Sequence, residues 1–139
     1  MPPAADAKTA VSYAHAAETD PLGQLASLQR KEAMTYVEND HQTHVLLCQR
    51  IFKEMASNQA ANGREVTMQY MIAAAAFLYE HPEAASDSKA QNLAGVESAL
   101  NVYEKFVAAD ARSRFKFLDG LEKDRAKGDL EKQVSSLCK

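Results

Sequence analysis

The chain has 139 residues, a mass of 15.3 kDa and a formal charge of -3, from 16 basic and 19 acidic side chains. This length fits one domain, and the near balance of charge argues against a dedicated nucleic-acid binder. Two cysteines are too few to hold together a small secreted fold, and 25 alanines predict helices that approach one another closely.

The first residues and the longest apolar run bear on where the protein acts. Residues 1–6 contain no basic region followed by an apolar one, which argues against a secretory signal. The apolar run over residues 71–79 is far shorter than the roughly 20 residues that span a membrane. We therefore expect a soluble, cytoplasmic protein in a reducing compartment, without a membrane partner. Cys48 and Cys138 are expected to be free thiols, with Cys48 buried as a small apolar side chain.

The spacing of apolar residues predicts an all-α protein, because they recur every three or four positions and nowhere alternate. Residues 4–18 are rich in alanine and offer little apolar surface to bury, so a helix there should be frayed or loosely docked. On this basis residues 1–19 form a loose N-terminal segment, and residues 20–139 form a single helical domain.

A long series of positions with helical spacing, most of them apolar, follows Asp20-Pro21, where proline suits the first helical position. We call this series the seam. Its apolar positions predict one helix that ends near residues 56–60, with a second possibility that Asn39 or Asp40 begins a new helix there. The seam consists of Leu22, Leu25, Leu28, Met34, Val37, His41, His44, Cys48, Ile51 and Met55.

The next helix is the most apolar and should be the central one. Asn62-Gly63 indicates a turn, and Asn62 with Glu65 resembles a capping box, so the helix should begin near Gly63. Apolar residues cover nearly all of its sides. Pro82 should end it, because the residue before a proline avoids the helical region.

Three further helices are expected in the C-terminal half. Ser88 and Gln91 form a second possible capping box, and Asp110 could cap a helix that ends at Lys127-Gly128. Asp129 should precede a short last helix. The sequence thus predicts four to six helices with short connections, in an antiparallel helical bundle or a short helical-hairpin array.

One group of side chains has the spacing of metal ligands. Glu38 and His41 form an E-x-x-H unit, and His44 and Cys48 are four residues apart. Carboxylate-bridged di-metal bundles use the E-x-x-H unit twice, whereas this chain contains it once. The alternative is that His41 and His44 are partly buried residues of the seam with a structural role. This structural interpretation is favoured over a metal site. We therefore assign no catalytic, metal-binding or cofactor-binding residue.

Motifs for catalysis are absent from the sequence. There is no G-x-S-x-G, no G-x-G-x-x-G and no phosphate-binding loop, which favours a non-enzymatic protein without a cofactor or an identifiable small-molecule substrate. Basic residues are frequent over residues 112–127, but acidic ones lie among them, so ion pairs on a solvated helix face are favoured over nucleic-acid binding.

The stretch Ala99-Leu100-Asn101-Val102-Tyr103-Glu104-Lys105-Phe106-Val107-Ala108-Ala109-Asp110 resembles the second helix of a tetratricopeptide repeat. It has a small alanine, an aromatic residue four positions later and then an acidic–basic pair. The resemblance covers residues 83–116 at most, and no second copy follows at that period. It implies a helical hairpin of the kind found in peptide- and protein-binding solenoids, and it assigns no functional residue.

These observations favour a non-enzymatic helical protein-interaction or scaffold module. The seams on several helices exceed what one small core needs, so a protein partner or a second copy of the chain should cover part of them. The alternative is a metal-binding helical bundle of the di-metal carboxylate type, centred on Glu38, His41, His44 and Cys48.

Overall fold

The computed structural model describes all residues, 1–139, and contains helices but no strands, which confirms the all-α class. There are seven α-helices rather than four to six, because residues 20–60 form two helices. None of the helices is both long enough and apolar enough to cross a membrane. The elements are α1 Ala7–Thr19, α2 Ala26–Asn39, α3 Gln49–Ala56, α4 Gly63–Glu80, η1 Pro82–Ala84, α5 Ser88–Ala109, η2 Ala111–Ser113, α6 Lys116–Ala126 and α7 Leu130–Leu137.

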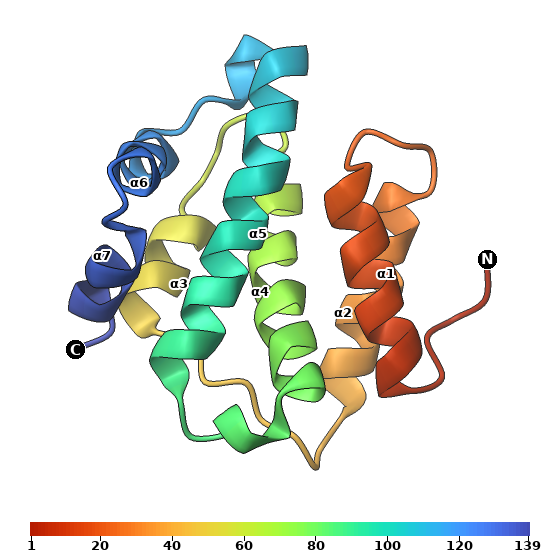
Figure 1. The fold of residues 1–139 in the computed structure, drawn as a ribbon. Coiled ribbons are helices and arrows are strands. Elements are labelled where there is room, and N and C mark those ends of the chain that lie inside the picture. The colour runs from red at the N-terminus through yellow and green to blue at the C-terminus, as the bar shows by residue number, and fades with distance from the viewer.

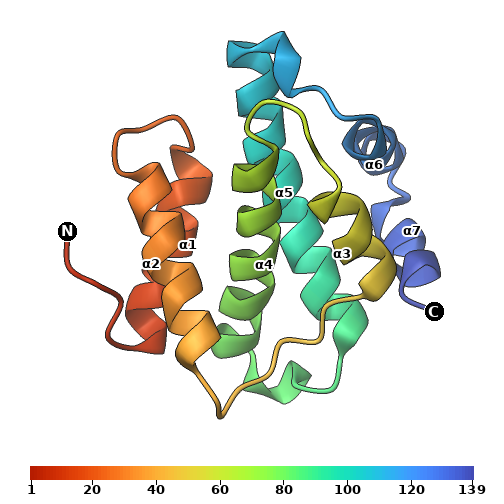
Figure 2. The same ribbon diagram turned by 180° about the vertical axis from the view of Figure 1, so that it is seen from behind.

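Helices α4 and α5 run antiparallel at the centre of the molecule (Figure 1). The pair α1 and α2 packs on one side of α4, whereas α3, α6 and α7 lie on the other side of the molecule, as both views show (Figures 1 and 2). Helix α4 was expected to be the buried central helix, and half of its residues are buried, among them Tyr70, Ile72 and Leu78. The two ends of the chain lie on opposite sides.

Two apolar clusters lie on either side of the central pair. The larger joins α3 to α7 and contains 15 buried residues, with Ile51, Met55 and Leu118 among the most buried. The smaller lies between α1, α2 and α4 and consists of Ala14, Ala33, Ile72 and Ala76. Because alanine has no side chain beyond Cβ, the backbones of these three helices can approach closely while still excluding water.

Helix α1 was expected to be frayed or loosely docked. In the structure its alanine face is buried, with Ala10 and Ala14 each 3% exposed and Ala17 fully covered. The partners that cover it are α2, α4 and α5. An alanine-rich helix therefore docks here through close backbone approach and not through large side chains.

Several helix ends lie where the sequence placed them, although the capping groups differ. Helix α4 begins at Gly63, but Asn62 adopts a left-handed conformation with φ 62° and donates its amide to Ser113 Oγ at 3.1 Å. Helix α5 begins at Ser88 and is capped by Asp87, whose carboxylate accepts from the Ala90 N–H at 3.0 Å. Gly128, with φ 78°, follows the end of α6 as expected.

The single long helix expected over residues 20–60 is wrong. Helix α2 ends at Asn39, and an extended connection over residues 40–48 precedes α3. Side chains of α5 bind the backbone of this connection: Gln91 Oε1 accepts from the Leu46 N–H at 2.8 Å, and Asn92 Nδ2 donates to the Leu46 carbonyl at 2.8 Å. Because these groups satisfy the backbone from outside, the connection needs no helical hydrogen bonds.

Asn92 is fully buried and joins three parts of the chain. Its Oδ1 accepts from the Cys48 N–H at 3.0 Å and from the Tyr70 hydroxyl, and its Nδ2 also donates to the Ser88 carbonyl at 2.7 Å. Burial raises the pKa of the Tyr70 hydroxyl, which therefore stays a donor. This one amide fixes the start of α3 against α4 and α5.

The expectation of free thiols is also wrong. Cys48 and Cys138 form a disulfide, with their Cα atoms 5.2 Å apart and 90 positions between them in sequence. The pair forms because α7 packs against α5 and α6 and brings the C-terminal end of the chain to the beginning of α3. The reducing compartment was expected from the lack of a secretory signal and of a membrane-spanning run, and the free thiols followed from it; the bonded pair argues against that expectation.

Candidate functional site

The candidate metal ligands do not lie on one helix. Glu38 is exposed in the last turn of α2, and His41 and His44 are exposed in the connection that follows. Cys48 is bonded to Cys138, so its sulfur is not a thiolate ligand. No three His, Cys, Asp or Glu side chains come together in an arrangement that could hold a metal ion. The helical premise of the E-x-x-H unit is therefore wrong, and the buried seam expected for His41 and His44 is wrong as well.

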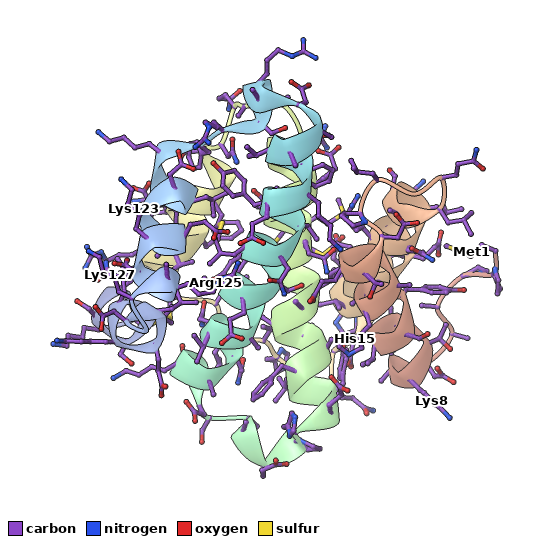
Figure 3. The ribbon with its side chains drawn as sticks, turned by 45° about the horizontal axis from the view of Figure 1, so that its top comes forward. Met1, Lys8, His15, Lys123, Arg125 and Lys127 are labelled. Atoms are coloured by element: carbon purple, nitrogen blue, oxygen red, sulfur yellow. A yellow bond between two sulfur atoms is a disulfide. The ribbon has the colours of Figure 1, made fainter.

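The basic residues of the C-terminal third divide into paired and unpaired ones. Arg112 pairs with Asp110 at 2.8 Å, and Arg114 pairs with Asp119 at 3.3 Å. The labelled Lys123 lies on α6 and Lys127 lies just after its end, on the side of the molecule away from Lys8 (Figure 3). The arginines thus form the ion pairs that the sequence favoured.

Arg125 connects α6 to α5 through three polar side chains. Its guanidinium donates to Asn101 Oδ1 at 2.8 Å, to Glu104 Oε1 at 2.7 Å and to Glu122 Oε1 at 3.3 Å. Burial and the hydrogen bond with Glu104 raise the pKa of Glu122 to about 7, although the charge of Arg125 acts in the opposite direction. Glu122 is therefore largely protonated in mildly acidic solution.

This cluster predicts a pH-dependent stability. Between the ordinary pKa of 4.5 and about 7, the folded protein binds a proton at Glu122 that the unfolded chain has lost. The free energy of unfolding should therefore fall as the pH rises through this window. Glu122→Gln stays uncharged and should show a smaller fall between pH 5 and pH 7.5 in urea denaturation. Glu131→Gln, an exposed change on α7, is the control, and identical pH profiles for Glu122→Gln and the wild type would contradict the assignment.

A cleft of about 200 Å³ between α1, α4 and α5 has an alanine-lined floor and an acidic rim. Two of its three carboxylates, those of Glu18 and Glu80, have partners in the chain. Glu18 accepts from the Ser98 hydroxyl and from Asn101 Nδ2 at 3.0 Å, and Glu80 lies 3.2 Å from His15 Nε2. His15 lies on α1, away from the basic end of the molecule (Figure 3). These contacts hold α1 against α4 and α5.

Three exposed leucines lie in the connection between α1 and α2 and in the first turn of α2. Leu22, Leu25 and Leu28 are 57%, 54% and 39% exposed. We call these three residues the leucine patch. They occupy the first positions of the seam that the sequence placed in the core, so their apolar character was recognised but their exposure was not. Three exposed leucines within the seven-residue stretch 22–28 make this surface a candidate for a contact.

A shallow hollow of about 460 Å³ adjoins the leucine patch, and Leu22 belongs to both. Its walls come from the end of α1, the connection and the end of α5. Lys105 Nζ donates to the Thr19 carbonyl at 2.7 Å and so holds the two sides together. The hollow is lined by Thr19, Asp20, Pro21, Leu22, Lys105, Ala108 and Ala109.

A second surface feature lies between α3 and the helices α6 and α7. It is an open groove of about 640 Å³, which we call the cationic groove. Arg50, Lys53 and Lys116 border it, and none of the three forms an ion pair with a residue of the chain. Its lining residues are Arg50, Lys53, Glu54, Ser57, Phe115, Lys116, Phe117 and Leu137.

No sequence motif indicates the cationic groove, because its residues come from three separate helices and their ends. The one local signal is the spacing of Arg50, Lys53 and Ser57, which places them on one face of a helix. Comparisons with protein-family models, with curated proteins and with solved structures find no significant match.

Proposed function

We propose that the protein is a non-enzymatic helical interaction module that associates with a second copy of itself through the leucine patch. The observation that carries this proposal is the exposure of Leu22, Leu25 and Leu28, at 57%, 54% and 39%. Apolar side chains so exposed are stabilised when another surface covers them, by roughly 25 cal/mol per Å² of apolar area removed from water.

The hollow beside the leucine patch supports a second copy as the occupant. A two-fold contact uses the same surface on both molecules, so protruding groups and the recess that receives them must lie together. Here Leu22 is both a member of the patch and a wall of the hollow. In one two-fold contact, the leucines of each copy can therefore enter the hollow of the other copy.

The charges around the hollow are compatible with such a contact. Asp20 and Lys105 line it, so its charges have opposite signs and balance locally. In a two-fold arrangement Asp20 of one copy can approach Lys105 of the other, whereas a surface of a single sign would repel its own copy. The resemblance of residues 83–116 to a tetratricopeptide hairpin is in keeping with an interaction module and stays a prediction.

The association should be weak, because few side chains take part and association itself costs several kcal/mol. A dissociation constant on the order of 100 µM corresponds to about -5.5 kcal/mol. Sedimentation equilibrium over a concentration series that brackets this value should show a monomer–dimer equilibrium. The double variant Leu22→Gln/Leu25→Gln should be monomeric throughout the series.

Leu46→Gln provides a matched control, since Leu46 is 41% exposed but lies in the connection between α2 and α3. It should leave the equilibrium unchanged. All three positions are exposed, so the variants should retain the far-ultraviolet circular dichroism of the wild type. A wild-type protein that stays monomeric at millimolar concentration, or a dimer weakened equally by Leu46→Gln, would refute the proposal.

The disulfide bears on where this module acts. Disulfides persist in oxidising surroundings and are rare in proteins of the cytosol. Because Cys48 and Cys138 are bonded, we infer an oxidising compartment in place of the cytoplasmic location that the sequence suggested. The protein can be isolated from its native cells with an alkylating reagent present during lysis. The fraction in which neither cysteine is alkylated is the disulfide-bonded fraction, and we expect it to be the larger one.

A further inference from the structure

We propose that the cationic groove binds small amphipathic organic anions, which are molecules with one carboxylate or phosphate head and an aliphatic or aromatic body. This site is separate from the leucine patch and the hollow and shares no residue with them. Its volume of about 640 Å³ lies within the range of roughly 300–1,000 Å³ that is usual for small-molecule sites.

The floor of the groove is apolar and only partly covered. Phe115, Phe117 and Leu137 line it and pack against the edge of the larger apolar cluster. Their remaining exposed area faces an open recess, where an aliphatic or aromatic body can remove it from water. Phe115 is held in place because its N–H donates to the Tyr103 hydroxyl at 2.8 Å.

The rim of the groove carries three basic side chains, Arg50, Lys53 and Lys116, that are not engaged in ion pairs. Arg50, Lys53 and Lys116 form no hydrogen bond or ion pair through their side chains, in contrast to Arg112, Arg114 and Arg125. Glu54 is the only acidic lining residue. The lining thus has an excess of two positive charges in a chain whose formal charge is -3.

The first turn of α6 adds backbone donors at the same edge. This helix has 11 residues, and no side chain caps its N-terminus. The N–H groups of Lys116 and Phe117 accordingly have no acceptor within the chain. Asp119, the acidic residue of this turn, is engaged by the Tyr103 hydroxyl at 2.7 Å and by Arg114. Free N–H groups at a helix N-terminus favour an anionic group beside them.

The disulfide holds two walls of the groove together. Cys48 precedes Arg50 by two residues on the α3 side, and Cys138 follows Leu137 directly on the α7 side. Because these walls are linked covalently, the recess exists before a ligand arrives, and little ordering is needed on binding. The groove thus combines an apolar floor with unpaired cations, free N–H groups and a fixed shape. This combination matches a ligand that has an anionic head on an apolar body.

Isothermal titration calorimetry on the oxidised full-length protein tests the site with four probes that share a ten-carbon chain, each below its micelle concentration. Decanoate and decyl phosphate should bind saturably, whereas decyltrimethylammonium and decanol should bind at least tenfold more weakly. Tighter binding of decanoate or of decyl phosphate shows whether the site prefers a carboxylate or a phosphate head group. Equal binding of the cationic probe, or no saturable binding of either anion, would overturn the proposal.

Charge variants locate the binding. Lys53→Gln and Lys116→Gln should each weaken decanoate binding roughly two- to fivefold, as expected for partly exposed ion pairs. Lys8→Gln removes the same charge from α1, on the side of the molecule away from α6 (Figure 3), and should leave the affinity unchanged. All three side chains are exposed, so folding is preserved. Loss of affinity in Lys8→Gln equal to that in the groove variants would assign binding to overall charge and refute the site.

Discussion

Reduction of the Cys48–Cys138 disulfide should lower the free energy of unfolding by about 3 kcal/mol. The bond joins residues 90 positions apart, so its removal frees a long loop in the unfolded chain. It also releases the end of α7 from the start of α3. Guanidinium denaturation of the oxidised and the reduced protein, followed by circular dichroism, measures the difference. For a domain of this size, such a loss is a large part of the usual total stability of 5–15 kcal/mol.

The double variant Cys48→Ala/Cys138→Ala separates the bond from the reductant. Its stability should be close to that of the reduced wild type and should not change when reductant is added. Coincident denaturation curves for the oxidised and the reduced wild type would show that the bond contributes nothing, and would contradict the account of how α7 is held.

Gly95→Ala should destabilise the protein by about 2 kcal/mol, as overpacking of a core contact does. Gly95 lies where α5 crosses α4, and a Cβ atom there would lie 2.7 Å from the Tyr70 carbonyl oxygen and 2.8 Å from its ring. The carbonyl belongs to a central helix and cannot move away alone, so the two helices must separate. Urea denaturation of the variant measures the effect.

Gly120→Ala is the matched control, because Gly120 also lies inside a helix but has nothing within 4 Å of the position of a new Cβ atom. Alanine should stabilise α6 there by up to about 1 kcal/mol. Both variants replace glycine by alanine, but Gly95→Ala should lower the free energy of unfolding and Gly120→Ala should raise it. Stabilisation by Gly95→Ala would mean that α4 and α5 do not approach as closely as described.

The central helices could be predicted because their signals are local. Gly63 and Pro82 bound α4, and the apolar spacing after Ser88 extends over the whole of α5. The break between α2 and α3 could not be predicted in the same way. Its cause is the binding of the connection by Gln91 and Asn92, more than 40 residues away in sequence, whereas the apolar spacing through His41 and His44 continues across it.

The surfaces were harder to predict than the helices. Apolar spacing identifies Leu22 and Leu25 as members of a seam, but it does not say whether another helix of the same chain covers that seam. The cationic groove requires the tertiary placement of Arg50, Lys116 and Leu137 from three helices. The pairing of the two cysteines has the same origin, because their contact depends on how α7 packs.

The leucine patch and the cationic groove use different parts of the fold. The patch belongs to the α1–α2 side, and the groove belongs to the side formed by α3, α6 and α7 (Figure 1). The central pair α4 and α5 separates them. A second copy bound at the patch would therefore leave the groove open, and self-association and ligand binding can be measured independently.

Methyl spectra recorded by nuclear magnetic resonance on dilution test the proposed self-association most directly. Between millimolar and micromolar protein, the signals of Leu22, Leu25 and Leu28 should shift together with those of Ala108 and Ala109, while the signal of Leu46 stays in place. Unchanged leucine-patch signals over this range, or shifts centred on another surface, would contradict the account.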